Sequence, residues 1–132
     1  MSQFQAQPLW QIELEAWGLD CQVVVAESGM LQLDIDSTEL PLAFFGLIET
    51  LSNQWYTQVT WSQWSSRHGN IHVTVIVAPD LTIPERIALQ LMGGSDPYRE
   101  KSALMCHWNG SPHPILLFKP NPKRLTATAG RG

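Results

Sequence analysis

The hydrophobic period of this chain changes along its length, and that change limits the folds it can adopt. Three N-terminal segments have the alternating or β-branched composition of strands: 9–16, 21–26 and 30–36. From Leu40 to Leu51 the apolar side chains fall at helical spacing instead. Residues 55–61 and 71–77 return to β-branched and aromatic composition. Strands on both sides of a helix indicate an α+β domain.

The second half of the chain adds two predicted helices and a final strand. A capping-box pattern begins one helix at Thr82, a glycine pair ends it, and an Asp-Pro pair at Asp96 begins another. Residues 115–118 are the last strand candidate, and the loop 27–29 is short enough to join two strands in a hairpin. We therefore expect a single, mostly antiparallel sheet with helices packed on one face. Its order would be β-meander, helix, β-hairpin, two helices and final strand.

Length and composition favour one domain. A chain of 132 residues with 44% hydrophobic and 15% charged residues has enough apolar material for one core. We expect that domain over 1–118, followed over 119–132 by a basic, mobile tail with four bases and no acid. Cys21 and Cys106 belong to no Cys-x-x-Cys motif, which argues against a disulfide framework. No leader pattern and no run of about 20 apolar residues is visible, so we expect a cytoplasmic protein without a membrane partner.

The charges are divided unevenly between the two halves of the chain. Residues 1–66 hold eight acidic residues and no Lys or Arg, whereas residues 67–132 hold all eight bases and four acids. The halves therefore carry formal charges of −8 and +4. Such a division suits an acidic, cation-binding wall opposite a basic, phosphate-binding wall. It also suits a domain in which the two signs neutralise one another across the core.

The parity of two strands predicts a group of polar side chains on one face of the sheet. Leu31, Leu33 and Ile35 mark the core face of residues 30–36, so Asp34 and Asp36 share the opposite face. The same argument for 71–77 places His72 on that face too. Two carboxylates at i and i+2 repel one another unless a cation lies between them, and oxygen ligands favour Mg²⁺ or Mn²⁺. The alternatives are that the aspartates solvate a strand end and that the histidine is structural.

Further residues are candidates for binding phosphate or nucleic acid. The polar loop before His72 contributes Arg67 and Asn70, and the predicted helix start after Asp96 contributes Arg99 and Lys101. Tyr56 and Trp64 are candidates for stacking on bases, whereas the parity of Trp55 and Trp61 predicts core positions. A plain hairpin loop and simple helix capping would explain the loop and the helix start equally well.

The order of these motifs resembles the palm of the archaeo-eukaryotic primase-polymerase superfamily. The matching block covers residues 31–78: Leu31-Gln-Leu-Asp-Ile-Asp36, a helix, a strand, and Ser66-Arg-His-Gly-Asn-Ile-His72 leading into the next strand. The resemblance implies a palm-like or RRM-like fold in which Asp34 and Asp36 bind the metal ions and His72 contacts the nucleotide phosphates. The family usually has a third acid on a later strand, and residues 115–118 contain none.

Two functional hypotheses follow. The first is a primase-polymerase-like nucleotidyltransferase that uses Mg²⁺ or Mn²⁺ in the replication of a mobile element such as a phage or plasmid. Its partners would be nucleotide, nucleic acid and a larger replication protein. The second is a non-catalytic module on the same scaffold that binds nucleic acid or another protein, suggested by the missing third acid and by the six tryptophans.

Overall fold

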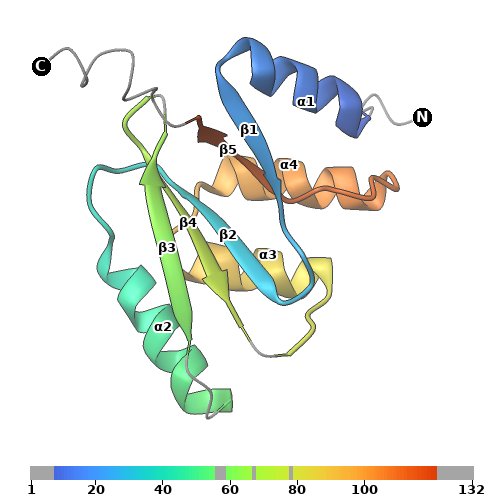
Figure 1. The fold of residues 1–132 in the computed structure, drawn as a ribbon. Coiled ribbons are helices and arrows are strands. Elements are labelled where there is room, and N and C mark those ends of the chain that lie inside the picture. The colour runs from blue at the N-terminus through green and yellow to red at the C-terminus, as the bar shows by residue number, and fades with distance from the viewer. Residues whose placement is uncertain (1–7, 56–58, 67, 78, 122–132) are drawn as a thin grey trace, which may run out of the picture.

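Four helices and two antiparallel sheets make up the described part of the chain in this computed structural model (Figure 1). The structure describes residues 8–55, 59–66, 68–77 and 79–121. In chain order the elements are α1 (Leu9–Gly18), β1 (Cys21–Val25), β2 (Met30–Ile35), α2 (Leu42–Trp55), β3 (Thr60–Ser65), β4 (Ile71–Ile76), α3 (Ile83–Met92), α4 (Pro97–Trp108) and β5 (Leu116–Pro120). The predicted α+β class is confirmed, but there are two sheets where one was expected.

The larger sheet has the strand order β2-β4-β3 and forms the main core with α2. The buried cluster between them includes Leu31, Leu33, Val73, Val75, Phe44, Leu47 and Leu51. The helical spacing predicted from Leu40 is therefore confirmed, because the side chains at that spacing pack on the sheet. The hairpin of β3 and β4 is also confirmed. Its first strand begins only at Thr60, since α2 continues to Trp55.

The smaller sheet is a ribbon of two strands, β1 and β5, from opposite ends of the described chain. The ribbon contacts the polar face of the larger sheet. The Phe118 carbonyl of β5 accepts a hydrogen bond from Trp64 Nε1 at 3.1 Å and lies 3.0 Å from His72 Nδ1. Gln32 Nε2 donates to the Val24 carbonyl of β1 at 3.0 Å. His72 is only 9% exposed as a result, so the polar face is covered and is not the open face that we expected.

The prediction of a strand over 9–16 is wrong, because these residues lie in α1. Alternation over so few residues is ambiguous when the segment contains good helix formers, and here Leu, Gln, Glu and Ala dominate. Trp10, Leu14 and Trp17 recur at helical spacing as well, and all three are exposed on α1. Ala16 is the one buried residue of this helix. Within residues 8–55, no β-meander forms.

The predicted hairpin of β1 and β2 is also wrong. Met30 N donates to the Glu27 carbonyl, so the chain does turn between the two strands. The strands then enter different sheets, where β1 pairs with β5 and β2 pairs with β4. Local turn chemistry indicates where the chain reverses, but it does not select the partner of a strand.

The two C-terminal helices begin as predicted and α3 also ends as predicted, whereas α4 continues to Trp108, beyond the expected end near Met105. Thr82 and Glu85 form a complete capping box, the C-cap of α3 is Gly93, and the Asp96 side chain accepts a hydrogen bond from Tyr98 N at the start of α4. No helix in the described ranges is long and apolar enough to cross a membrane.

Groups from α3, α4 and the turn between them close the outer edge of β2. Gln90 Oε1 accepts from Gln32 N at 2.9 Å, and Ser95 Oγ accepts from Asp34 N at 3.0 Å. On the acceptor side, Arg99 Nη1 donates to the Gln32 carbonyl and the Asp96 amide donates to the Asp34 carbonyl. These groups take the place of a neighbouring strand, so β2 is not available for pairing with another chain.

Candidate functional site

A pocket of about 160 Å³ lies where one end of the larger sheet meets the ribbon. Its polar lining residues come from the larger sheet and from the β3–β4 loop: Asp34, Ser66, His68, Asn70 and His72. Its less polar lining residues come from the ends of the ribbon strands and the residues beside them: Leu19, Cys21, Phe118 and Pro120. The pocket therefore has one wall from each sheet, and it exists only because the ribbon packs on the polar face.

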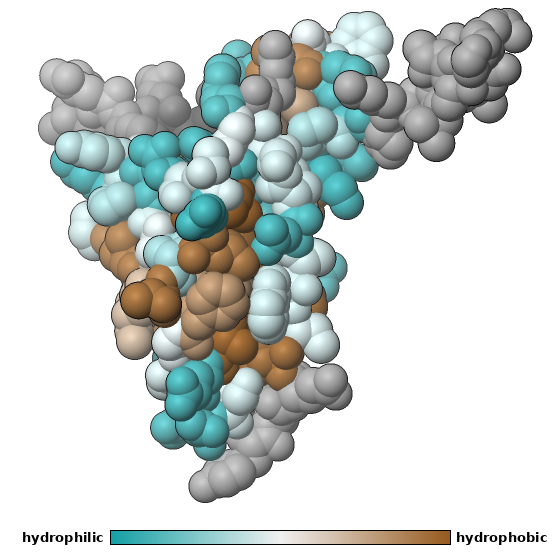
Figure 2. Space-filling model, turned by 90° about the vertical axis from the view of Figure 1, so that its left-hand side faces the viewer, coloured by the Kyte–Doolittle hydropathy of each residue, from teal (hydrophilic) through white to brown (hydrophobic). Residues whose placement is uncertain are grey.

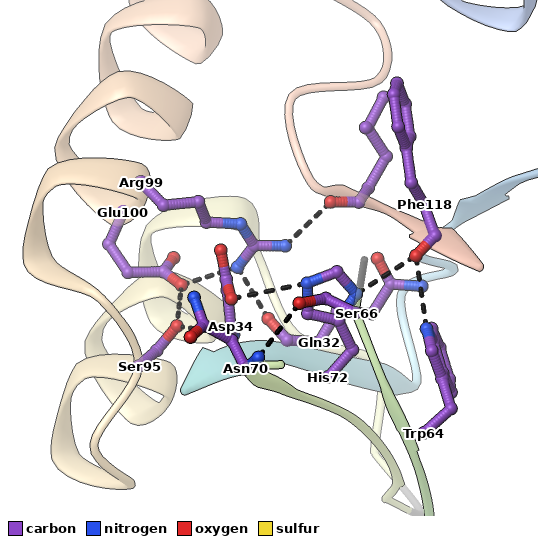
Figure 3. A network of polar contacts seen from close by, with 11 residues as sticks. Gln32, Asp34, Trp64, Ser66, Asn70, His72, Ser95, Arg99, Glu100 and Phe118 are labelled. Carbon is purple, nitrogen blue, oxygen red and sulfur yellow. Dashed lines mark hydrogen bonds and ion pairs between the residues drawn. The ribbon is translucent and has the colours of Figure 1, made fainter. Parts of the chain in front are cut away.

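His72 is held on both sides within the protein (Figure 3). Its Nδ1 faces the Phe118 carbonyl, which can only accept, so this nitrogen carries a proton. Its Nε2 lies 3.3 Å from Asp34 Oδ1, and the edge of its ring meets Trp64 with the ring planes 84° apart. Both ring nitrogens thus face oxygen atoms of the protein. His72 therefore lies against the carboxylate of Asp34 and offers little to a ligand directly.

Asp34 is the charged group that a ligand can reach. Strand pairing sets its position, because Asp34 and His72 are directly opposite one another in the β2–β4 register. Its backbone is fixed by the Ser95 hydroxyl and the Asp96 amide, while its side chain remains 24% exposed in the pocket. Oδ1 is buried, and the contact with His72 meets the distance of an ion pair but not the geometry of a hydrogen bond. A second proton on the imidazole would make the contact a charged pair.

The loop between β3 and β4 is a tight turn that forms the rim of the pocket. Ser66 N donates to the Asn70 carbonyl, and Asn70 N donates back to Ser66 Oγ. Gly69 adopts a φ of +85°, a conformation that costs glycine little. The loop therefore holds Asn70 at the pocket and leaves His68 exposed at its mouth. Arg67, the other residue predicted here to bind phosphate, lies outside the described residues.

The structure does not bring Asp36 to the pocket. β2 ends at Ile35, and Asp36 is exposed in the bend that follows, where strand parity no longer fixes the direction of a side chain. Across the described residues, no three His, Cys, Asp or Glu side chains come close enough together to hold a metal ion. Asp34 is therefore the one carboxylate among the residues that line the pocket.

Arg99 and Lys101 lie on α4, away from the pocket lining. The guanidinium of Arg99 is already bound, since it donates to the carbonyls of Gln32 and Leu116 and pairs with Glu100. Glu100 is fully buried and also accepts from Ser95 Oγ at 2.6 Å. Arg99 therefore joins the two sheets and α4. Lys101 is exposed on the same helix.

Of the two aromatic residues predicted to stack on bases, Trp64 lies beside the site. Its indole is half-buried, and Lys119 Nζ lies 5.3 Å from the ring centroid. Tyr56 lies outside the described residues. Trp61, which parity placed in the core, is 40% exposed because β3 is at the edge of the sheet.

Sequence reasoning missed the ribbon half of the site, namely Leu19, Cys21, Phe118 and Pro120. Residues 115–118 were predicted as a strand, but no local signal pairs that strand with β1. The structure places a partly exposed carboxylate, beside a histidine, in the lining of a small pocket with one polar and one less polar wall. No family of known proteins, no curated protein and no solved structure matches this chain.

Proposed function

We propose that the pocket binds a base of a nucleotide or of single-stranded nucleic acid, and that the protein acts as a metal-independent binding module. One observation carries the proposal: the Asp34 side chain is partly exposed, at 24%, in a pocket whose opposite wall is mainly apolar. A nucleobase matches this division, since its edge carries N–H donors and its faces are apolar. The carboxylate can accept hydrogen bonds and, without a bound proton, cannot donate them.

A phosphate group fits this pocket less well than a base does. Without a cation, phosphate beside the Asp34 carboxylate places two negative groups together. The His72 imidazole offers phosphate no free ring nitrogen, because its Nδ1 faces the Phe118 carbonyl and its Nε2 lies beside Asp34. Phosphates would instead lie outside the pocket, and we propose the exposed Lys119, which lies beside Trp64, as a base that contacts them.

The size of the pocket also favours a single group. Pockets that enclose a whole drug-sized ligand have volumes of roughly 300–1,000 Å³. The pocket beside Asp34 measures about 160 Å³. It would take one base and leave the sugar and phosphates of the same nucleotide outside.

A second candidate function is the metal-dependent nucleotidyl transfer that the primase-polymerase resemblance implies. The direct pairing of Asp34 with His72 supports it, because the two motifs of that family are neighbours here. In that case Asp34 and Asp36 would share Mg²⁺ or Mn²⁺ with a nucleoside triphosphate. The two functions differ in whether they need a cation and in whether they need Asp36.

A titration with labelled single strands distinguishes the two functions. In the presence of EDTA we expect oligo(dC) and oligo(dA) to bind at least about tenfold more tightly than oligo(dT). The reason is that thymine lacks the exocyclic amino group from which Asp34 would accept a hydrogen bond. Asp34→Asn should weaken binding of oligo(dC) by about 10- to 100-fold, which is the loss of a charged hydrogen bond. Fluorescence anisotropy measures both effects.

Asp36→Asn is the matched control, because it removes the same charge two residues away and outside the pocket. It should bind like the unaltered protein in EDTA. Binding that requires Mg²⁺ and is lost in both variants would support nucleotidyl transfer instead. No binding of any of these strands or of a nucleoside triphosphate, with or without Mg²⁺, would contradict both functions.

A further inference from the structure

The two outer edges of the larger sheet differ in whether their backbone groups are hydrogen-bonded. Groups from α3, α4 and the turn between them fill the β2 edge, as described above. β3 forms the other edge, and it pairs with β4 on one side only. An unprotected edge strand is a template on which another strand can pair.

The hydrogen-bond pattern shows which groups of β3 point outward. Ser66 N donates to the Asn70 carbonyl, so residues 66 and 70 form a hydrogen-bonded pair in the register that continues through β3 and β4. Hydrogen-bonded pairs alternate in an antiparallel ladder, so Ser62 and Trp64 bond to β4. The N–H and C=O groups of Trp61, Gln63 and Ser65 therefore face away from β4. Among the described residues, no group bonds to them.

β3 carries none of the usual features that protect an edge. Its sequence, Thr-Trp-Ser-Gln-Trp-Ser, contains no charged residue and no proline, and most of its side chains are exposed. A charge or a proline is the common way to prevent edges from pairing. The neutral strand gives no electrostatic attraction to a basic or an acidic peptide. It also gives no repulsion against a copy of itself.

An aromatic cluster lies beside this edge, on the side of the sheet that α2 covers. Phe44 is buried between Phe45 and Trp61, with ring centroids 5.7 and 5.5 Å away. Phe45 is 47% exposed and Trp61 is 40% exposed. Apolar side chains gather in the middle of the surface in Figure 2, on the side of the molecule formed by α2 and β3. Hydrogen-bonding groups and apolar surface are thus available at the same place.

We propose that β3 pairs with β3 of a second copy of this chain, antiparallel and about a twofold axis. When the twofold axis passes through Gln63, Gln63 lies opposite Gln63 of the second copy, and Trp61 lies opposite its Ser65. In this register every outward-facing N–H and C=O group of Trp61, Gln63 and Ser65 forms a hydrogen bond. The two sheets become one continuous sheet. Each aromatic cluster lies beside the joint, as an isologous interface requires. The pairing is independent of the pocket, since Trp64 and His72 lie on the other face.

The test is the mass of the protein across a concentration series, measured by sedimentation or light scattering. The unaltered chain should approach twice its monomer mass of 14.8 kDa. Gln63→Pro should remain monomeric, because it removes an outward-facing donor and leaves the β3–β4 ladder intact. Gln63→Lys should also remain monomeric, because it places two positive charges opposite one another at the axis.

Gln11→Lys is the matched control, since it adds the same charge to an exposed position on α1 and should dimerise normally. Hydrogen exchange provides a second reading. In the dimer the amides of Trp61, Gln63 and Ser65 should be protected, and dilution should remove that protection while leaving Ser62 and Trp64 protected.

Two results would overturn the proposal. One is an unaltered chain that stays monomeric throughout the series, which would leave the edge to an extended segment of another protein. The other is a dimer that persists in both Gln63 variants, which would place the interface on a different surface.

Discussion

Glu100 is a buried charged residue whose removal should strongly destabilise the fold. It is 0% exposed, and it accepts hydrogen bonds from Gln90 Nε2 at 2.7 Å and Ser95 Oγ at 2.6 Å and pairs with Arg99. Glu100→Ala leaves the buried donors of Gln90 and Ser95 without their acceptor and removes the charged partner of the Arg99 guanidinium. We expect the free energy of unfolding to fall by about 3–5 kcal/mol, measured by urea denaturation.

Glu49→Ala is the control for that prediction, because Glu49 is exposed on α2 and should change the stability by less than about 0.5 kcal/mol. Equal effects of the two substitutions would show that the Glu100 network does not stabilise the fold.

At the residue scale, parity predicted the central contact of the site and the position of Trp64 beside it, but not the other groups around it. Alternation along two strands placed Asp34 and His72 on one face, and they are cross-strand partners. The same rule failed for Asp36, because the strand ends one residue before it. Parity gave no prediction for Arg99, which binds the backbone carbonyl groups of Gln32 and Leu116 as well as Glu100. No side-chain pattern encodes a bond to a distant backbone carbonyl.

Among the elements, α3 has the clearest local sequence signal, and the contribution of its capping box to stability can be tested. Thr82 Oγ1 accepts from Glu85 N, and Glu85 Oε1 accepts from Thr82 N at 2.8 Å. Thr82→Ala removes the first of these bonds. We expect it to lower the free energy of unfolding by about 1 kcal/mol at pH 7, measured by urea denaturation. Thr38→Ala, in an exposed loop, should have no comparable effect.

The contribution of the capping box should also depend on pH. The Thr82 backbone amide, and then its hydroxyl bond, hold the pKa of Glu85 below its ordinary value of 4.5. A carboxyl with a lowered pKa stabilises the folded state above 4.5 and loses that contribution as the pH falls through its folded pKa. The difference in the free energy of unfolding between Thr82→Ala and the unaltered protein should therefore become smaller as the pH is lowered. A difference that widens as the pH falls would contradict this assignment.

The elements that sequence patterns predicted correctly are those with local causes. Capping residues mark α3 and α4, and the change of period marks α2. The strand prediction failed at α1, because its sequence fits both the alternation of a strand and the spacing of a helix. Most of its side chains are exposed, so a pattern of buried residues does not distinguish the two. Sequence reasoning also failed for β1, because the partner of a strand depends on contacts far away in the sequence.

At the scale of the whole molecule, the two sheets differ in how far apart their paired strands lie in the sequence. β3 and β4 are consecutive strands, whereas β1 and β5 pair Cys21 with Pro120 across most of the described chain. Closing so long a loop costs conformational entropy before any contact compensates for it. The ribbon, and with it the pocket, should therefore form after the transition state for folding.

This order of events predicts different kinetic effects for two buried residues. Leu117 on β5 is 3% exposed and Val75 on β4 is 0% exposed, so truncating either to alanine destabilises the core. Leu117→Ala should mainly speed unfolding, with a φ-value of about 0–0.3, whereas Val75→Ala should slow folding, with a φ-value above about 0.5. Stopped-flow folding and unfolding rates over a range of urea concentrations give both values. A φ-value for Leu117 equal to or above that for Val75 would mean that the ends of the chain meet early, and that the pocket forms together with the core.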